Sequence, residues 1–395
     1  MLKKVIFGHH DEDTLRQFEK CLKVGNVVGG VLCADGHYGY SQPVGGVVVY
    51  DGQIAPSGVG YDIACGNKAV KTNLVYDDIK NDISNIMDEL ERKILFGFGR
   101  KNPNPIDHEL FDDEAWNVYK EFGQDVHDEL KQLAREQLGT TGSGNHYVDI
   151  LIDQKTEEVW IGNHFGSRGL GHRTATGFLN LAKGLNFTDK APGESMETPP
   201  TLFDIDSDLG QMYFEAMQLA GRYAYAGGDI VINQVLDILG AESVFEVHNH
   251  HNYAWKETHF GKEYIVVRKG ATPAAPGQLG FVGGSMGDIS VILQGVDSEK
   301  SKNAFYSTVH GAGRIMSRTQ AAGKMNWKTK KRVGGLISEE KMQRAVKDFG
   351  VELRGAGPDE SPFVYRKLKE VLDAHKDTIE ILHVLKPVGV VMASD

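Results

Sequence analysis

Histidine carries most of the chemical information in this chain. There are 15 histidines, and many stand in short turns of Gly, Asn and Ser that follow β-rich runs. One such turn, G-V-G-Y-D-I-A-C-G at 58–66, places Asp62 and Cys65 three residues apart. A carboxylate and a thiolate at this spacing can bind one metal ion, or the sulfur can bridge two ions. A turn aspartate beside a small buried cysteine is the structural alternative.

Two further motifs combine a glycine-rich turn with a histidine at the end of a predicted strand. The run G-T-T-G-S-G-N-H-Y-V-D-I at 139–150 enters a predicted strand at His146. Its glycine loop either cradles phosphate with backbone N–H groups or is a plain turn. In W-I-G-N-H-F-G-S-R-G-L-G-H at 160–172, His164 ends a strand and Arg168 follows. The planar fork of an arginine matches two phosphate oxygens.

Three histidines crowd the end of another strand, in E-V-H-N-H-H-N-Y at 246–253. On an extended chain His248 and His250 share one face, and His251 takes the other. At most a few of these side chains can be ligands, and the rest can support the ligands or lie on the surface.

His310 heads a turn of small residues in S-T-V-H-G-A-G-R-I-M-S-R at 307–318. It can be a nucleophile, a metal ligand or a turn residue, and a neutral imidazole attacks well near pH 7 because its pKa is about 6.5. Two other predicted turns are also rich in Gly and polar residues: C-A-D-G-H-Y-G-Y at 33–40 and G-G-S-M-G-D-I-S at 283–290. Together these motifs favour a metal-assisted reaction at a phosphate centre over packing roles.

The elements that must position these residues are mixed without a regular βαβ rhythm, so we predict an α+β fold. No linker divides the chain, and a single domain is expected over 1–395, with a loop insertion at 187–203 that holds three of the 12 prolines. Helical periodicity and β-branched runs give the boundaries. The predicted helices are 77–97, 112–138, 206–225, 338–349 and 361–375. The predicted strands are 44–50, 146–152, 158–162, 244–249, 263–268, 289–294 and 387–392.

Composition narrows the class of protein. The chain has 395 residues, 41% hydrophobic and 25% charged, with a net charge of -11, which argues against a general nucleic-acid coat protein. The basic run at 328–332, beside Trp327, is either a local binding patch or a solvated surface run. Three cysteines make no disulfide framework, and neither a signal pattern nor a long apolar run is visible. We therefore expect a cytoplasmic protein.

Seven motifs, in chain order, resemble those of the RNA-splicing ligases of the RtcB family, and the resemblance covers nearly the whole chain. They are G-x-D-I-x-C-G, G-x-G-N-H, H-x-G-S-R-G-L-G-H, H-H-N-Y, R-K-G-A, G-S-M-G and H-G-A-G-R-x-M-S-R. The resemblance implies an RtcB-like fold and a centre of two Mn²⁺ ions bridged by Cys65. One ion would be held by Asp62, Cys65 and His146, and the other by Cys65, His164 and His251. A thiolate with imidazoles by itself leans toward zinc, so manganese rests on the resemblance.

The same resemblance implies the role of His310. Its imidazole would attack the α-phosphate of GTP, release pyrophosphate and pass GMP to an RNA 3′-phosphate, which a 5′-hydroxyl then attacks. A 2′,3′-cyclic phosphate would first be opened by water. The substrate would be RNA with these ends, in splicing or repair, with or without an activating protein partner.

The family resemblance also implies a nucleotide pocket and contacts with RNA. The residues expected at the nucleotide are Asn145, His146, Tyr147, Val148, Asp149, His251, Asn252, Gly283, Gly284, Ser285, Met286, Ser290, His310, Gly311, Ala312, Gly313 and Tyr365. RNA phosphates are expected near Arg168, His172, Arg314 and Arg318, in a basic trough whose affinity falls as salt rises.

Three positions depart from the family pattern. Met392 stands where a lysine usually contacts guanine, and a methionine cannot donate to the guanine carbonyl. Asp149 replaces a longer glutamate, and Gly283 replaces a proline. Two alternatives therefore stay open: an RNA-end repair or capping variant with altered nucleotide preference, and a metal-dependent phosphodiesterase that forms no nucleotidyl-histidine. A non-enzymatic RNA-binding module would have no need of Cys65 with four motif histidines.

Overall fold

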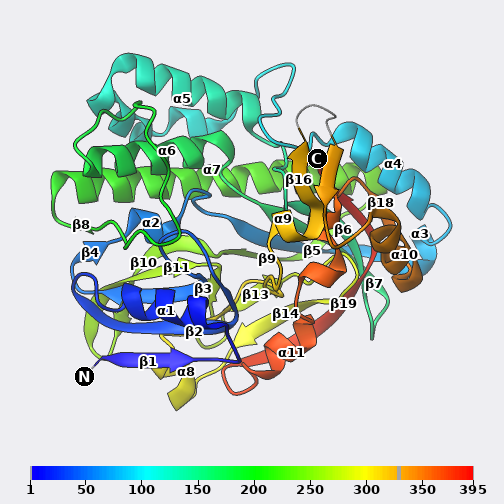
Figure 1. Cartoon of the computed structure of the whole chain (residues 1–395). Helices are drawn as coiled ribbons and strands as arrows, with labels where there is room; N and C mark the ends of the chain where they lie inside the picture. Colours follow the sequence, from blue (N-terminus) through cyan, green and yellow to red (C-terminus); the bar gives the residue numbers. More distant parts are fainter. Residues whose placement is uncertain (1, 327–330, 395) are drawn as a thin grey trace.

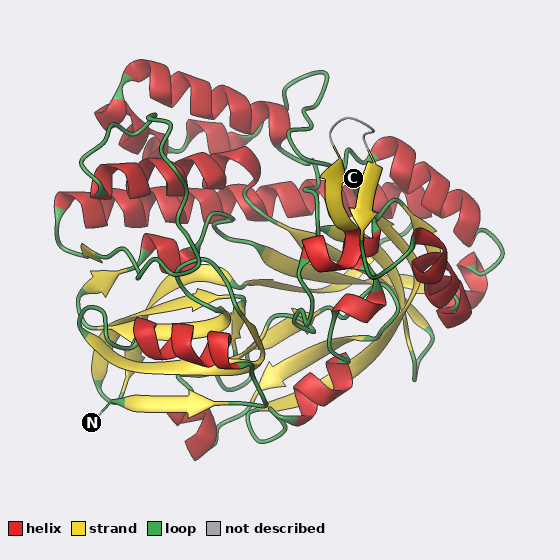
Figure 2. Ribbon diagram, viewed as in Figure 1, coloured by secondary structure: helices red, strands yellow, loops and turns green. Residues whose placement is uncertain are grey.

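The computed structural model describes residues 2–326 and 331–394, and its architecture is α+β, as predicted (Figures 1 and 2). A five-stranded sheet has the order β1 (Lys3–Ile6), β2 (Val27–His37), β3 (Val44–Tyr50), β11 (Lys262–Lys269) and β10 (Asn252–His259). Its strands are antiparallel except for the β1–β2 pair.

A larger sheet of eight strands carries most of the histidine motifs. Its order is β13 (Leu279–Val282), β14 (Ser290–Gly295), β19 (Ile379–Met392), β6 (Tyr147–Asp153), β7 (Glu158–Phe165), β5 (Gly66–Val75) and β9 (Ser243–His250), with β18 (Glu352–Arg354) beside β19. Three two-stranded pairs complete the strands: β4 (Gln53–Ile54) with β8 (Phe203–Asp204), β12 (Ala271–Pro273) with β15 (Ser307–Val309), and β16 (Gly323–Asn326) with β17 (Lys331–Gly334).

Three long helices form a layer along one side of the sheets (Figure 2). They are α5 (Gln124–Gln137), α6 (Arg168–Ala182) and α7 (Asp208–Leu239). The other helices are α1 (Glu12–Cys21), α2 (Pro56–Val59), α3 (Tyr76–Ile79), α4 (Ile83–Lys93), η1 (Glu109–Asp112), η2 (Glu114–Phe122), α8 (Glu299–Asn303), α9 (Arg318–Ala322), α10 (Glu339–Phe349), η3 (Pro358–Glu360), η4 (Pro362–Val364) and α11 (Leu368–Asp373).

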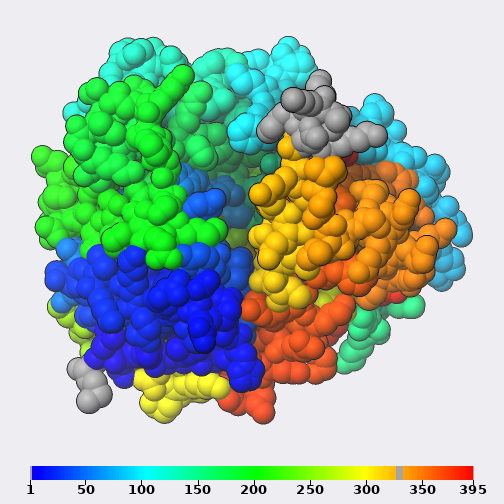
Figure 3. Space-filling model, in the orientation of Figure 1, coloured from blue at the N-terminus to red at the C-terminus, as the bar shows by residue number. Residues whose placement is uncertain are grey.

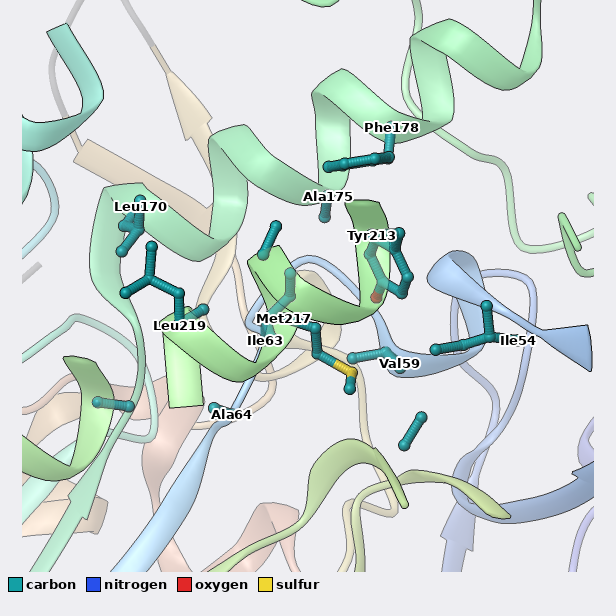
Figure 4. Close-up of a cluster of buried hydrophobic side chains, with 14 of the residues drawn as sticks. Ile54, Val59, Ile63, Ala64, Leu170, Ala175, Phe178, Tyr213, Met217 and Leu219 are labelled. Atoms are coloured by element: carbon teal, nitrogen blue, oxygen red, sulfur yellow. The ribbon is translucent and has the colours of Figure 1, made fainter. Parts of the chain in front are cut away.

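The largest apolar core lies between these helices and the turn that contains Asp62 and Cys65. Ile63 and Ala64, the two residues between them, are fully buried. They pack in one cluster with side chains of α6 and α7, among them Leu170 and Leu219 (Figure 4). Burial of this apolar surface anchors the turn, because each fully buried side chain of this size contributes about 1.5–3 kcal/mol.

The predicted helices are partly correct. Segment 112–138 is not one helix, since Gly123 breaks it into η2 and α5 with a φ of 124°. Segment 206–225 extends to Leu239, beyond the predicted end, and its glycines serve close packing: a Cβ at Gly228 would lie 3.3 Å from Phe165. Segment 361–375 contains only η4 and α11.

All seven predicted strands are present. Segment 387–392 is the end of the 14-residue β19, which shifts its register between Pro387 and Gly389. The strands β2, β5 and β10 and the helix α6 were not predicted. The glycines of β2 and α6 are typical of turns. Residues 187–202 contain neither helix nor strand. Residues 327–330, which hold most of the proposed basic patch, lie outside the described residues.

Candidate active site

Sheet topology brings the candidate metal ligands to one edge. In the order β6-β7-β5-β9 neighbouring strands are antiparallel, so the starts of β6 and β5 meet the ends of β7 and β9. His146 and Cys65 directly precede β6 and β5, while His164 and His251 lie at the ends of β7 and β9. Tyr147 pairs with His164 across this edge.

The turn that carries Cys65 is fixed by backbone hydrogen bonds to the segment after β9. The N–H of His251 donates to the Cys65 carbonyl at 2.8 Å, and the N–H of Ala64 donates to the Asn252 carbonyl at 2.8 Å. Ala64 holds a φ of 61°, an uncommon conformation for a residue with a side chain. These bonds and the buried core beneath keep the thiol at a defined place.

Five side chains form two groups that share the thiol of Cys65. The Sγ atom lies 3.1 Å from His164 Nε2 and 3.5 Å from His146 Nε2. His146 Nε2 lies 3.1 Å from Asp62 Oδ2. Within each group the possible ligand atoms lie within 4.8 Å of one another; the groups are Cys65 with His164 and His251, and Asp62 with Cys65 and His146. The two sets coincide with those implied by the family resemblance.

The protonation chemistry of the cluster fits divalent cations. Burial, followed by the nearby Asp62 carboxylate, raises the pKa of the Cys65 thiol well above its usual range, so a cation is needed to hold a thiolate there. Burial lowers the pKa of His164 and His251, and the neutral imidazole is the form that ligates. A bridging thiolate, three imidazoles and a carboxylate fit a pair of transition-metal ions.

The other histidines of the 246–253 motif do not face the cluster. The ring of His250 stacks on Tyr225, with centroids 3.9 Å apart, and that of His248 lies 3.7 Å from the same tyrosine. They pack β9 against α7, which accounts for them as structural residues.

His310 adjoins the cluster and is oriented by a buried aspartate. Its ring centroid lies 4.9 Å from that of His251. Its Nδ1 lies 2.6 Å from Asp35 Oδ2, and the same oxygen accepts the N–H groups of His310 at 3.0 Å and Gly311 at 3.3 Å. Burial opposes ionisation of Asp35, but its interactions with His310 prevail and lower its pKa. Because the carboxylate is an acceptor, the neutral imidazole carries its proton on Nδ1, and its lone pair is then on Nε2.

The role of Asp35 was missed in the sequence. The motif at 33–40 drew attention to it, but its partner stands 275 positions away. The pairing arises because β2 passes the turn that follows β15, and no local spacing encodes that contact.

One cavity of about 270 Å³ joins this cluster to most of the predicted nucleotide residues. Its lining residues come from both sides of the hollow that Figure 3 shows between the blue and green segments and the orange segments. The predicted residues that line it are Asp62, Cys65, Asn145, Tyr147, Asp149, His164, His251, Asn252, Gly283, Gly284, Ser285, Met286, His310, Gly311, Ala312, Gly313, Arg314 and Tyr365.

Several predicted residues lie elsewhere. Val148 points to the opposite face of β6 and packs in the core with α4 and α7. Ser290 supports the 283–290 turn, because its Oγ accepts the Gly284 N–H at 3.3 Å. His172 stacks on Tyr61 outside this cavity, with centroids 5.4 Å apart.

The arginines that follow His310 are held by acidic residues. Arg314 donates to Tyr365 Oη at 3.0 Å and to both oxygens of Glu360 at 3.3 Å. Arg318 contacts Asp359 at 2.8 Å and Glu360 at 2.5 Å. Both guanidiniums are therefore paired with carboxylates, and their predicted contact with RNA phosphate stays a prediction.

The three residues that depart from the family pattern, Asp149, Gly283 and Met392, also line this cavity. Met392 lines the cavity and pairs in register with Tyr147. Burial raises the pKa of Asp149, and its Oδ1 has no hydrogen-bond partner among the residues that the structure describes. A Cβ at Gly283 would lie 2.0 Å from the Tyr147 hydroxyl, so this tyrosine occupies space that a larger residue would need.

Sequence comparisons identify the family. A family model described as "tRNA-splicing ligase RtcB" matches residues 17–393. The chain belongs to the RtcB family. It is 32% identical over 379 residues to an RNA-splicing ligase RtcB of Escherichia coli K12, which covers 90% of this chain and 87% of that protein.

Archaeal relatives give a similar result. A tRNA-splicing ligase RtcB of Methanococcus maripaludis is 30% identical over 472 residues, covering 99% of this chain and 93% of the relative. One of Thermococcus kodakarensis is 30% identical over 449 residues, covering 95% and 90%. The family is one of ligases, and the α+β fold with its histidine-rich sheet edge is consistent with membership. In the described part of the chain, no helix has the length and apolar character to cross a membrane.

Proposed function

We propose that this protein joins an RNA 3′-phosphate or 2′,3′-cyclic phosphate to a 5′-hydroxyl through a nucleotidyl-His310 intermediate. The observation that carries the proposal is the hydrogen bond from His310 Nδ1 to Asp35, beside the Cys65 cluster. It leaves Nε2 as a nucleophile in a cavity large enough for part of a nucleotide. The names of the relatives, RNA- and tRNA-splicing ligases, support RNA as the substrate.

Nucleotidyl transfer to His310 is a nucleophilic substitution at phosphorus. Nε2 attacks the α-phosphorus of a nucleoside triphosphate, a P–N bond forms, and the bond to the pyrophosphate oxygen breaks. Asp35 stabilises the positive charge that develops on the imidazole, through the Nδ1–H bond. The turn at Gly311 and Gly313 lets the backbone approach the phosphate closely, and Gly313 holds a φ of 75°.

The second and third steps transfer the nucleotide and join the RNA. An oxygen of the RNA 3′-phosphate attacks the P–N phosphorus, which frees His310 and leaves a nucleotide-capped 3′ end. The 5′-hydroxyl then attacks the RNA phosphorus, and the nucleoside monophosphate departs with the electron pair. Two Mn²⁺ ions held by the Cys65 cluster would neutralise phosphate charge and activate the attacking oxygens.

The base end of the cavity fits a guanine or an adenine. The free Asp149 oxygen can accept from the ring N–H and amino group of guanine or from the amino group of adenine. Met392 supplies no donor for the guanine carbonyl. We propose GTP as the nucleotide donor because of the family resemblance. The lack of a donor at Met392 favours a second candidate function, in which the enzyme also uses ATP.

Ligation of defined RNA ends tests the proposal. Wild-type protein with Mn²⁺ and GTP should join 3′-phosphate or cyclic-phosphate RNA to 5′-hydroxyl RNA, and should not join 3′-hydroxyl to 5′-phosphate ends. His310→Ala should abolish joining. Cyclic-phosphate hydrolysis at the full rate by His310→Ala, with no joining by the wild type, would instead support the phosphodiesterase alternative.

A further inference from the structure

One aromatic side chain in the loop that follows α4 is almost fully exposed. Phe98 presents 92% of its surface to solvent, whereas Phe96 packs against the apolar core of α4, β6 and β7. Gly97 and Gly99, with φ values of 122° and 67°, form the turn that holds Phe98 outward. Exposure of an aromatic ring to water is unfavourable, and a ligand that covers the ring would remove this unfavourable contact.

The turn is attached to the loop that leads to His146. The N–H of Gly97 contacts the carbonyls of Thr141 and Gly142, each at 3.1 Å. A Cβ at Gly142 would lie 1.9 Å from His146 Nδ1. The Phe98 turn therefore contacts the backbone segment that packs directly on a candidate metal ligand. In Figure 1 it begins the loop that follows α4.

Arg168 lies between the turn and the cluster. Its Nη2 donates to the Gly97 carbonyl at 2.8 Å and its Nε to Thr140 Oγ1 at 3.0 Å. Among residues 2–326 and 331–394, no carboxylate forms an ion pair with Arg168, unlike Arg314 and Arg318. Arg168 also holds a φ of 53°, a strained backbone that is characteristic of functional positions.

We propose that the Phe98 turn is a nucleotide subsite for an RNA strand entering the metal centre. A nucleobase stacks on Phe98, and the adjoining phosphates contact Arg168 and the exposed Arg100. Alternating base faces and phosphates along single-stranded RNA match an aromatic ring flanked by two cations. The subsite accepts any base, because every base has a π face. This inference rests on the proposed function, since it requires RNA at the metal centre.

RNA binding measured without catalysis tests the subsite. We would titrate fluorescein-labelled RNA with Mn²⁺ present, using one RNA with a 3′-phosphate end and another with a 5′-hydroxyl end. Phe98→Ala should weaken binding of at least one of them by roughly tenfold or more, and Phe98→Trp should preserve it. The RNA that is affected identifies the strand that occupies the subsite.

Phe260 provides the matched control. Its ring is 55% exposed in the turn between β10 and β11, and it lines no part of the active-site cavity. Phe260→Ala should bind both RNAs like the wild type. Unchanged affinity of Phe98→Ala for both RNAs, or an equal loss in Phe260→Ala, would overturn the subsite.

Nucleotidylation separates this test from that of the proposed function. Phe98→Ala should form the His310 adduct from GTP as well as the wild type, because that step precedes RNA. Failure of the wild type to form an adduct would contradict the proposed function alone, and the binding titration would still decide the subsite.

Discussion

The two ends of the active-site cavity are built differently. At the metal end, neighbouring antiparallel strands bring the ligand candidates together, and backbone hydrogen bonds and a buried core fix the turn of Cys65. At the base end, the wall comes from the 283–290 turn, the 358–365 segment and the end of β19. Two of the three departures from the family pattern, Gly283 and Met392, lie in this wall, and the third, Asp149, lies on β6. A sheet edge tolerates little change in its ligands, whereas a wall of separate segments can exchange side chains.

Removal of the shared thiol should have the largest effect. Cys65→Ala deletes the only side chain that belongs to both ligand groups, so we expect less bound Mn²⁺ and a loss of ligation of about 10³-fold or more. Metal content by mass spectrometry and joining rates check this prediction. Full metal occupancy with an unchanged rate would refute the shared-ligand geometry.

Asp35→Asn should have the next largest effect. An asparagine can retain hydrogen bonds to the backbone, but it can present its amide to His310 and does not stabilise a developing imidazolium charge. We expect adduct formation to slow by roughly 10²–10⁴-fold while metal content stays at the wild-type value. A rate within a few-fold of wild type would show that the carboxylate charge is dispensable.

Met392→Lys tests the base end. A lysine at this position can donate to the guanine carbonyl, so the preference for GTP over ATP should rise by about 10- to 100-fold. Competition of the two nucleotides for adduct formation measures it, with Met392→Leu as a control of similar shape. An equal gain in both lysine and leucine variants would assign the effect to packing.

Alanine substitutions at two glycines, one at each end of the cavity, should have the smallest effects. A Cβ at Gly66, beside Cys65, would lie 2.6 Å from the Asn249 carbonyl oxygen, and backbone cannot move aside easily. Gly66→Ala should lower the free energy of unfolding by about 1–3 kcal/mol. A Cβ at Gly283 would lie 2.0 Å from the Tyr147 hydroxyl and 3.1 Å from Tyr147 Cζ. Adding Tyr147→Phe removes the closer of these contacts and should recover much of the loss in Gly283→Ala. Denaturant unfolding of the three variants checks this; no recovery in the double variant would place the strain elsewhere.

The sequence revealed the candidate metal ligands but not the Asp35–His310 pair. Cys65, Asp62 and the three ligand histidines stand in motifs that a single chain reveals, and three of the strands around them, β6, β7 and β9, were predicted from their β-branched residues. The Asp35–His310 pair depends on two strands far apart in sequence, and local spacing contains no information about it. Two predicted helix boundaries were wrong: Gly123 interrupts a continuous apolar face, and α7 continues past residue 225 through Gly228, which packs against Phe165.

The central claim is that His310 becomes covalently nucleotidylated beside the Cys65 cluster. Intact mass after incubation with Mn²⁺ and GTP, without RNA, tests it most directly, with fragmentation to locate the modified residue. The account predicts one added GMP on His310, absent from His310→Ala. An AMP adduct formed only with ATP would keep the mechanism and change the donor. No adduct with either nucleotide, in protein shown to hold metal, would contradict the account.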